Sequence, residues 1–219
     1  MSAPAVKICG VTRAEDARAA YEAGAAYIGT VLVPSTPRAI GAPRARAVME
    51  GVPLPLVVVV CDLSAAQAAA AARESGASVI QLHGDEPPEV LDALRDEGEW
   101  TLWKAVRIRE ADELRPALER YAGRTDGILI EGWHPRFPGG GGAGFDWGAV
   151  AAVRDEIPEG VNFIAAGGLT PGNVAEAVDL LRPDTVDTSS GVELSPGVKD
   201  PTRIRAFILA ARTPGPTVP

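Results

Sequence analysis

The chain has 219 residues, of which 46% are hydrophobic and 23% are charged, a composition typical of a folded globular domain and not of a disordered chain. Its net charge of −8 and its pI near 4.9 argue against a dedicated binder of nucleic acid or of anionic membranes. Two cysteines and two histidines are too few for a disulfide-rich scaffold or a zinc cluster. The sequence has no apolar run of about 18 residues, and residues 1–7 are too short for a signal peptide, so we expect a cytoplasmic enzyme or binding protein.

Short apolar runs that are typical of buried strands alternate along the chain with amphipathic segments that are typical of helices. The predicted strands are 5–9, 27–33, 56–60, 78–82, 100–106, 127–130, 161–165 and 185–187. The predicted helices are 12–24, 43–50, 64–76, 87–95, 111–121, one that starts at 147, 171–181 and 201–211. Thr12, with Glu15 three residues later, is predicted to cap the first helix, and Ser64 to cap the third. The run at 56–60 is continuously apolar, which indicates a strand that is buried on both faces, as in a parallel sheet.

Eight strands alternating with eight helices predict an α/β fold, the (β/α)8 TIM barrel, in a single domain. An open, doubly wound sheet is the alternative. That fold usually has fewer strands and a glycine-rich dinucleotide loop after the first one, whereas here the first strand is followed by Gly10, Val11 and Thr12. We expect the barrel to span 1–212 and the proline-rich tail 213–219 to be frayed.

In a TIM barrel, active-site residues lie at the carboxyl ends of the strands and in the loops that follow them. This rule selects Cys9, Arg38, Asp62, His83, Arg107, Glu131, Gly167, Gly168 and the segment 187–191. The loops 166–169 and 188–191, after the last two predicted strands, are rich in glycine and serine, which supply backbone N–H groups and hydroxyls to a phosphate without a cation. The alternative is that both loops are ordinary tight turns, with Thr170 and Ser189 as helix caps.

Each of the remaining candidates has two interpretations. Cys9 is either a base that acts as a thiolate or an inert core residue, and Cys61 is expected to serve packing. Glu131 is either a general acid whose pKa is raised by an apolar barrel wall or a carboxylate that holds the following loop. Arg38 either binds a substrate carboxylate through two hydrogen bonds or is an ordinary exposed arginine. His83 is either a base or a hydrogen-bonding core residue.

Six blocks occur in order, each at the barrel element where it is expected. They are 7–12 (KICGVT), 81–86 (QLHGDE), 104–106 (KAV), 145–147 (FDW), 167–174 (GGLTPGNV) and 186–193 (VDTSSGVE). With these blocks the chain resembles the phosphoribosylanthranilate isomerases, the barrel enzymes of tryptophan biosynthesis, from the first strand to the last helix.

The resemblance implies an Amadori rearrangement of N-(5-phosphoribosyl)anthranilate to 1-(2-carboxyphenylamino)-1-deoxyribulose 5-phosphate, without metal or cofactor. It implies that Glu131 stands where the family's acid protonates the ribose ring oxygen, and that Cys9 is the base that removes the C2 proton. Arg38 would hold the anthranilate carboxylate. The other implied substrate-binding residues are Lys7, His83, Gly167, Gly168, Asp187, Ser189, Ser190 and Gly191. We therefore expect a small phosphorylated substrate as the partner, no nucleic acid and no membrane, and a monomer or a homodimer.

The sequence departs from the family's pattern in two places. The family's acid is an aspartate, whereas this chain has Glu131. The following loop has four glycines at 139–142 where the family has a lysine and hydroxyl residues, and an apparent insertion contains Trp133 and His134. The glycine run is typical of a mobile lid, and Trp133 is placed to cover an aromatic substrate. Two alternatives therefore stay open: a paralogue that acts on a different phosphorylated or aromatic substrate, and an inactive protein that binds a phosphorylated ligand.

Overall fold

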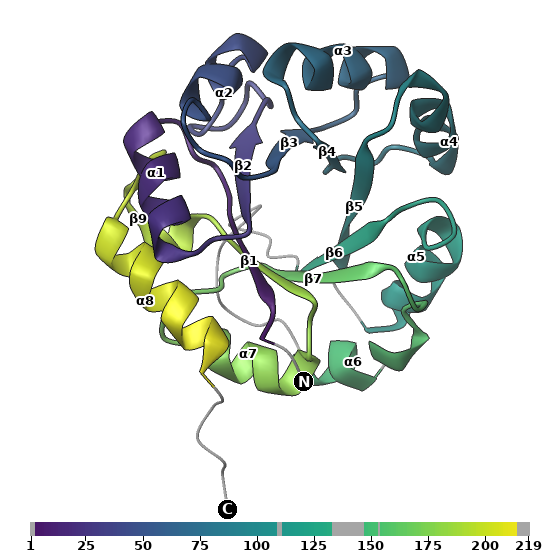
Figure 1. The fold of residues 1–219 in the computed structure, drawn as a ribbon. Coiled ribbons are helices and arrows are strands. Elements are labelled where there is room, and N and C mark those ends of the chain that lie inside the picture. Colours follow the sequence, from purple (N-terminus) through teal and green to yellow (C-terminus); the bar gives the residue numbers. More distant parts are fainter. Residues whose placement is uncertain (1–2, 109–110, 133–146, 153, 214–219) are drawn as a thin grey trace, which may run out of the picture.

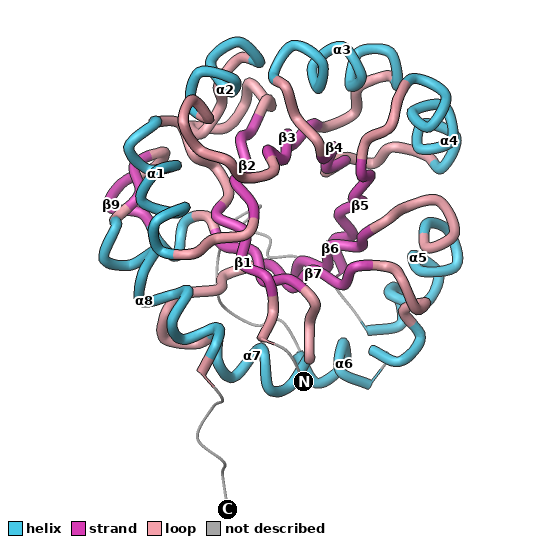
Figure 2. Tube along the Cα trace, viewed as in Figure 1, coloured by secondary structure: helices cyan, strands magenta, loops and turns pink. Residues whose placement is uncertain are grey.

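A computed structural model describes residues 3–108, 111–132, 147–152 and 154–213 of the chain. Eight parallel strands pair in sequence order, and the pairing of β1 with β8 closes them into a barrel. The helices surround the strands as an outer ring (Figure 1), and the strands form the inner ring (Figure 2). The predicted single-domain (β/α)8 barrel is confirmed. None of the helices in the described part of the chain is long and apolar enough to cross a membrane.

The strands of the barrel are β1 (Ala5–Ile8), β2 (Tyr27–Val31), β3 (Leu56–Val60), β4 (Val79–Leu82), β5 (Thr101–Ile108), β6 (Gly127–Gly132), β7 (Asn162–Ala166) and β8 (Thr185–Thr188). The helices are α1 (Ala14–Ala23), α2 (Ala42–Val48), α3 (Ala65–Ser75), α4 (Pro88–Glu97), α5 (Leu114–Tyr121), α6 (Trp147–Ala152), α7 (Val174–Leu181) and α8 (Pro201–Arg212). Between β8 and α8, a 3-10 turn (Ser190–Val192) leads into a small antiparallel pair, β9 (Glu193–Ser195) and β10 (Val198–Lys199).

The start of α1 differs from the prediction. Arg13, not Thr12, is its N-cap residue, and no side chain caps it. The Thr12 hydroxyl instead donates a 2.6 Å hydrogen bond to the carbonyl of Gly197, in the hairpin of β9 and β10. A long-range contact thus replaces the predicted capping box. The prediction for Ser64 is confirmed, because its hydroxyl accepts a hydrogen bond from the backbone of Gln67 in a complete capping box.

Strand β3 shows how the sequence pattern produces the layers. All five of its residues are buried, as the continuous apolar run predicted. Leu56, Val58 and Val60 pack in a cluster that includes alanines of α3, and so they face the helices. Val57 belongs to a cluster built only from strand residues, which fills the inside of the barrel around Trp103. Because successive side chains point to opposite faces, one strand supplies both layers.

A buried ion pair fixes the loop that follows β4. Lys104 on β5 and Glu86 are 2% and 1% exposed in their side chains, and Lys104 Nζ lies 2.9 Å from Glu86 Oε2. Glu86 Oε1 accepts hydrogen bonds from the backbone N–H groups of Asp62 and Gly84, at 2.9 and 3.1 Å. Lys104 Nζ also donates to the carbonyl of Gly84 at 2.7 Å. This pair therefore holds the segment directly after His83 against the middle of β5 and against Asp62, which follows β3.

Removal of Glu86 should destabilise the protein far more than loss of a surface carboxylate. Glu86→Ala leaves the Lys104 ammonium buried and unpaired, which typically costs about 3–5 kcal/mol. The matched control is Asp92→Ala, because Asp92 pairs with Arg124 on the exposed surface and such pairs contribute about 1 kcal/mol or less. Urea unfolding followed by circular dichroism measures both losses. Equal free energies of unfolding for the two variants would contradict this role of Glu86.

Candidate functional site

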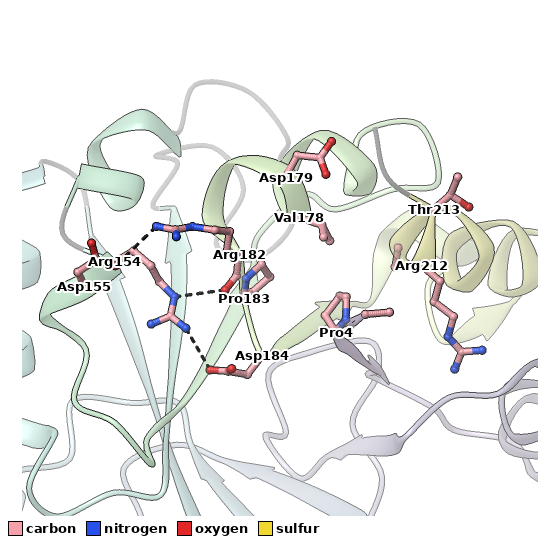
Figure 3. A pocket seen from close by; sticks show the side chains of 12 residues that line it. Pro4, Arg154, Asp155, Val178, Asp179, Arg182, Pro183, Asp184, Arg212 and Thr213 are labelled. Carbon is pink, nitrogen blue, oxygen red and sulfur yellow. Dashed lines mark hydrogen bonds and ion pairs between the residues drawn. The ribbon is translucent and has the colours of Figure 1, made fainter. Parts of the chain in front are cut away.

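The described part of the chain contains a cavity at each end of the barrel. The cavity at the amino ends of the strands has about 680 Å³ and is lined by residues such as Pro4, Asp184 and Arg154 (Figure 3). Arg154 donates to the carbonyl of Arg182 at 3.3 Å and pairs with Asp184 at 3.5 Å. Its guanidinium is therefore occupied by protein groups, and no predicted site residue lies there.

The cavity at the carboxyl ends of the strands has about 600 Å³ and lies where a TIM barrel places its active site. It brings together nearly all of the predicted site residues: Cys9, Arg38, Asp62, His83, Arg107, Glu131, Gly167, Gly168, Asp187, Thr188, Ser189, Ser190 and Gly191. Lys7, the remaining one, does not line the cavity. Its side chain is fully buried and pairs with Asp187, which does.

Lys7 and Asp187 are neighbours across the pairing of β1 with β8, and Lys7 Nζ lies 3.1 Å from Asp187 Oδ2. Burial opposes the charge on Lys7, but Asp187 and Cys9 together hold its pKa above the ordinary value. Asp187 Oδ1 is buried and has no hydrogen-bond partner among the described residues. The pair therefore places a buried cation beside the cavity and leaves one buried carboxylate oxygen of Asp187 without a partner among the described residues.

Cys9 directly follows β1 and is only 7% exposed. A Cβ atom at Gly29 would lie 2.9 Å from both Cys9 Sγ and Lys7 Cε, so these two side chains meet at that glycine. Burial raises the pKa of the Cys9 thiol, and the charge of Lys7 offsets only part of the shift. Cys9 is therefore a neutral thiol at pH 7 in the resting protein. Cys61, expected to serve packing, is only partly buried and lines the cavity.

Glu131 on β6 does not lie in the apolar surroundings that would raise its pKa. Its Oε2 atom lies 3.1 Å from His83 Nε2, and His83 Nδ1 lies 2.9 Å from Gln81 Nε2 on β4. Burial alone would raise the pKa of Glu131, but the hydrogen bond from His83 and the charges of His83, Arg107 and Lys7 lower it overall. The expectation of a raised pKa was wrong, because His83 after β4, Arg107 on β5 and Lys7 on β1 all favour the charged carboxylate.

Arg38 is not an ordinary exposed arginine. Its Nε and Nη2 atoms donate to the two carboxylate oxygens of Glu193 at 2.8 and 2.7 Å. Lys199 Nζ, fully buried, lies 2.8 Å from Glu193 Oε1. A guanidinium has five N–H groups, so the Nη1 edge of Arg38 has donors left for a ligand carboxylate. Glu193 and Lys199 thus fix the orientation of Arg38 in the cavity wall.

The loops after β7 and β8 lie side by side. Gly167 and Gly168 have φ of +93° and +68°, conformations that a residue with a Cβ adopts only with strain. The Thr188 hydroxyl donates to the carbonyl of Leu169 at 2.8 Å and so ties the two loops together. Lys199 Nζ donates to the carbonyl of Ser189 at 3.0 Å. The two loops themselves contain no basic residue, but the buried Lys199 ammonium of β10 contacts the second loop at Ser189.

The seventh helix begins later than predicted, and Asn173 is its N-cap residue. Its Oδ1 accepts from the backbone N–H of Thr170 at 2.7 Å, and its Nδ2 donates to the carbonyl of Gly168 at 3.1 Å. Helix α7 consequently begins at Val174 and not at Pro171, and Thr170 is not its N-cap residue. Through these two hydrogen bonds, Asn173 stabilises the conformation of the loop that contains Gly167 and Gly168.

Sequence reasoning missed three supporting residues: Gln81, Glu193 and Lys199. The sequence contains a signal for Gln81, because it lies two residues before His83, and side chains two residues apart on a strand point to the same face. Glu193 and Lys199 had none, because their contacts with Arg38 and Ser189 join distant parts of the chain. Trp133, His134 and the glycines 139–142 lie outside the described residues.

Comparisons with known proteins identify the family of the chain. A model of the N-(5'phosphoribosyl)anthranilate (PRA) isomerase family matches residues 6–210. The N-(5'-phosphoribosyl)anthranilate isomerase of Myxococcus xanthus is 42% identical over 212 residues, which cover 95% of this chain and 96% of the relative. That of Pseudomonas putida is 40% identical over 210 residues, covering 94% and 96%.

Solved structures give the same result. The phosphoribosyl anthranilate isomerase of Thermotoga maritima is 34% identical and superposes with a TM-score of 0.87, covering 95% of this chain and 98% of that one. A phosphoribosyl anthranilate isomerase in complex with reduced 1-(o-carboxyphenylamino)-1-deoxyribulose 5-phosphate is 32% identical, with a TM-score of 0.83 and the same coverage. The chain therefore belongs to the N-(5'-phosphoribosyl)anthranilate isomerase family.

Proposed function

We propose that this protein isomerises N-(5-phosphoribosyl)anthranilate to 1-(2-carboxyphenylamino)-1-deoxyribulose 5-phosphate in tryptophan biosynthesis. The observation that carries the proposal is that Cys9, directly after β1, and Glu131, on β6, line one cavity together with Arg38 and the glycine and serine loops. A base and an acid thus share a cavity with an arginine suited to a carboxylate and with loops suited to a phosphate.

In the proposed reaction, Glu131 gives a proton to the ribose ring oxygen, and the C1–O bond breaks to leave an iminium ion. The Cys9 thiolate then takes the C2 proton, and the C–H electron pair forms the C1–C2 double bond while the C=N electron pair returns to nitrogen. The resulting enolamine tautomerises to the ketone. No electrons are exchanged with another molecule, so the reaction is balanced without an oxidant or a reductant.

The supporting groups have separate tasks in this scheme. Arg38, oriented by Glu193, holds the carboxylate of the anthranilate ring. The loops at Gly167–Gly168 and Ser189–Gly191 receive the phosphate, with the Lys199 cation beneath Ser189. The Lys7 ammonium stabilises the Cys9 thiolate, because it is buried beside it and interacts with its charge. We further propose that a small phosphorylated molecule is the partner, without nucleic acid, metal or cofactor.

Two further proposals concern the oligomeric state of the protein and its location in the cell. One member of the family, from Thermotoga maritima, is described as dimeric, so we propose either a monomer or a homodimer for this protein. A cytoplasmic location is proposed from the biosynthetic role.

The decisive experiment is a fluorescence assay of the purified protein with freshly generated phosphoribosylanthranilate. The parent should turn the substrate over, and Cys9→Ala and Glu131→Gln should each lower kcat by at least about 100-fold, the lower end of what general acid–base groups contribute. Glu131→Asp, which restores the family's acid, should stay active. A parent that binds the substrate without turnover would contradict the proposal. Activity on another phosphorylated substrate that requires Cys9 would then favour the paralogue.

The pH dependence of kcat/KM follows from the two catalytic pKa values. The resting pair holds one proton, because the pKa of Glu131 is lowered and that of Cys9 is raised. The reactive form, protonated Glu131 with the Cys9 thiolate, also holds one proton, so its small share of the population is constant between the two pKa values. We expect kcat/KM to be flat around neutral pH, to fall in acid as a second proton arrives, and to fall in alkali as the only proton leaves. Steep change around pH 7 would contradict this assignment.

Substitution of Arg38 should weaken binding of the substrate carboxylate specifically. Arg38→Lys removes the planar two-pronged donor, and the loss of one charged hydrogen bond, about 1.5–3 kcal/mol, should raise KM about tenfold or more. The control is the phosphoribosyl derivative of aniline, which lacks the carboxylate. Steady-state kinetics should show that Arg38→Lys changes KM much less for this compound. Equal losses for the two substrates would show that Arg38 serves the structure of the cavity and not the carboxylate.

A further inference from the structure

Asn173 contacts two consecutive peptide units of the loop after β7. Its Oδ1 atom accepts from the backbone N–H of Thr170 at 2.7 Å, and its Nδ2 atom donates to the carbonyl of Gly168 at 3.1 Å. A reversed amide would set its nitrogen against an N–H group and its oxygen against a carbonyl, so the two backbone partners determine the orientation of the side chain. Gly168 and Leu169 line the cavity, and Asn173 lies behind them.

The two peptide units differ in how firmly they are held. The unit between Leu169 and Thr170 is held at both ends, because its carbonyl accepts from the Thr188 hydroxyl at 2.8 Å. The unit between Gly168 and Leu169 is held through its carbonyl by Asn173, and its N–H group has no hydrogen-bond partner in the described part of the chain. Gly168 has φ of +68° and no Cβ atom, so steric hindrance does not prevent this unit from rotating. The contact with Asn173 therefore determines its orientation.

We propose that Asn173 is a positioning residue of the phosphate site, which keeps the Leu169 N–H group directed into the cavity so that it donates to the substrate phosphate. The described part of the chain has no cis peptide bond, and in a planar trans peptide the N–H group points opposite to the carbonyl. Since the Gly168 carbonyl points away from the cavity to Asn173, the Leu169 N–H group points toward the cavity. This inference rests on the proposed function, in which this loop receives the phosphate.

Leu169 lies where the two phosphate loops meet. A Cβ atom at Gly191 would collide with the Leu169 carbonyl, so the loop after β8 packs directly against this residue. The Lys199 ammonium contacts the same loop at Ser189, 3.0 Å from its carbonyl oxygen. An N–H group at this junction can donate to a phosphate that the second loop also contacts. Because hydrogen bonds to charged acceptors are about twice as strong as those between neutral groups, loss of this donor should weaken phosphate binding measurably.

The test observes the Leu169 N–H group directly. The dipeptide Gly-Leu occurs only at residues 168 and 169 of the sequence, so protein that carries ¹³C-carbonyl glycine and ¹⁵N-leucine gives a single signal in an HNCO spectrum. On saturation with ribose 5-phosphate, the Leu169 amide proton of the parent should move downfield, because it then donates to a charged oxygen. In Asn173→Ala this shift should be absent or much smaller.

Affinity provides the second readout. Asn173→Ala should weaken binding of ribose 5-phosphate about tenfold or more, as expected for one hydrogen bond to a charged group, and should raise KM for phosphoribosylanthranilate similarly. Anthranilate, which lacks a phosphate, should bind parent and variant equally. The matched control is Asn162→Ala, because Asn162 accepts from the Thr185 hydroxyl at 3.0 Å where β7 and β8 begin, at the opposite end of the barrel. This variant should leave the affinity for ribose 5-phosphate unchanged.

Three results would overturn the proposal: a Leu169 signal that does not move in the parent with bound ribose 5-phosphate, a folded Asn173→Ala variant with unchanged affinity, and equal losses for ribose 5-phosphate and anthranilate. The signal of the parent tests the proposal even if Asn173→Ala does not fold. A parent that does not bind ribose 5-phosphate would overturn it together with the phosphate site. A parent with the expected shift but no isomerase activity would refute the proposed function and leave the role of Asn173 intact.

Discussion

The pairing of β1 with β8 is the constraint on which the site depends. Four residues of each strand are in register, and this contact closes the barrel between the two ends of the domain. It sets Lys7 beside Asp187, and it brings Cys9 next to the loop 188–191. Because parallel strands direct their carboxyl ends to the same rim, the same closure that buries the core also gathers the reactive side chains. The site is therefore a consequence of barrel closure and not of any single loop.

Buried lysines with carboxylate partners occur at three points of this rim. Lys7, Lys104 and Lys199 are almost fully buried, and each lies 2.8–3.1 Å from a carboxylate. Such pairs add little net stability, since removing two charges from water costs about as much as their attraction returns. Their effect is geometric, because a broken pair would leave a buried charge. Lys7 lies beside the base Cys9, Lys104 fixes the loop after His83, and Lys199 fixes the orientation of Arg38 through Glu193. All three lysines of the chain thus lie in buried ion pairs, whereas arginines such as Arg124 are exposed on the surface.

The limits of sequence reasoning are visible at particular residues. The barrel followed from the count of alternating elements, and the site list followed from strand ends, because both depend only on local periodicity. The direction of the Glu131 pKa shift was predicted wrongly, because His83 follows β4 and is far from Glu131 in sequence. Thr12 was misjudged as a cap for a similar reason: the carbonyl of Gly197 is nearly the whole chain away and competes successfully for its hydroxyl. Rules based on neighbouring residues fail where a side chain forms its hydrogen bond with a residue far away in sequence.

The amino-acid sequence by itself determined the alternation of strands and helices, the closed parallel barrel, the family and the residues that meet at its rim. Hydrophobic periodicity, glycines and short motifs encode these features within a few residues of one another. Only the tertiary structure decided how those residues are charged and oriented: that Cys9 is a neutral thiol, that Glu131 faces a histidine held by Gln81, and that Arg38 is fixed by Glu193. Protonation and orientation depend on burial and on neighbours within about 4 Å, and these neighbours come from strands that only folding brings together.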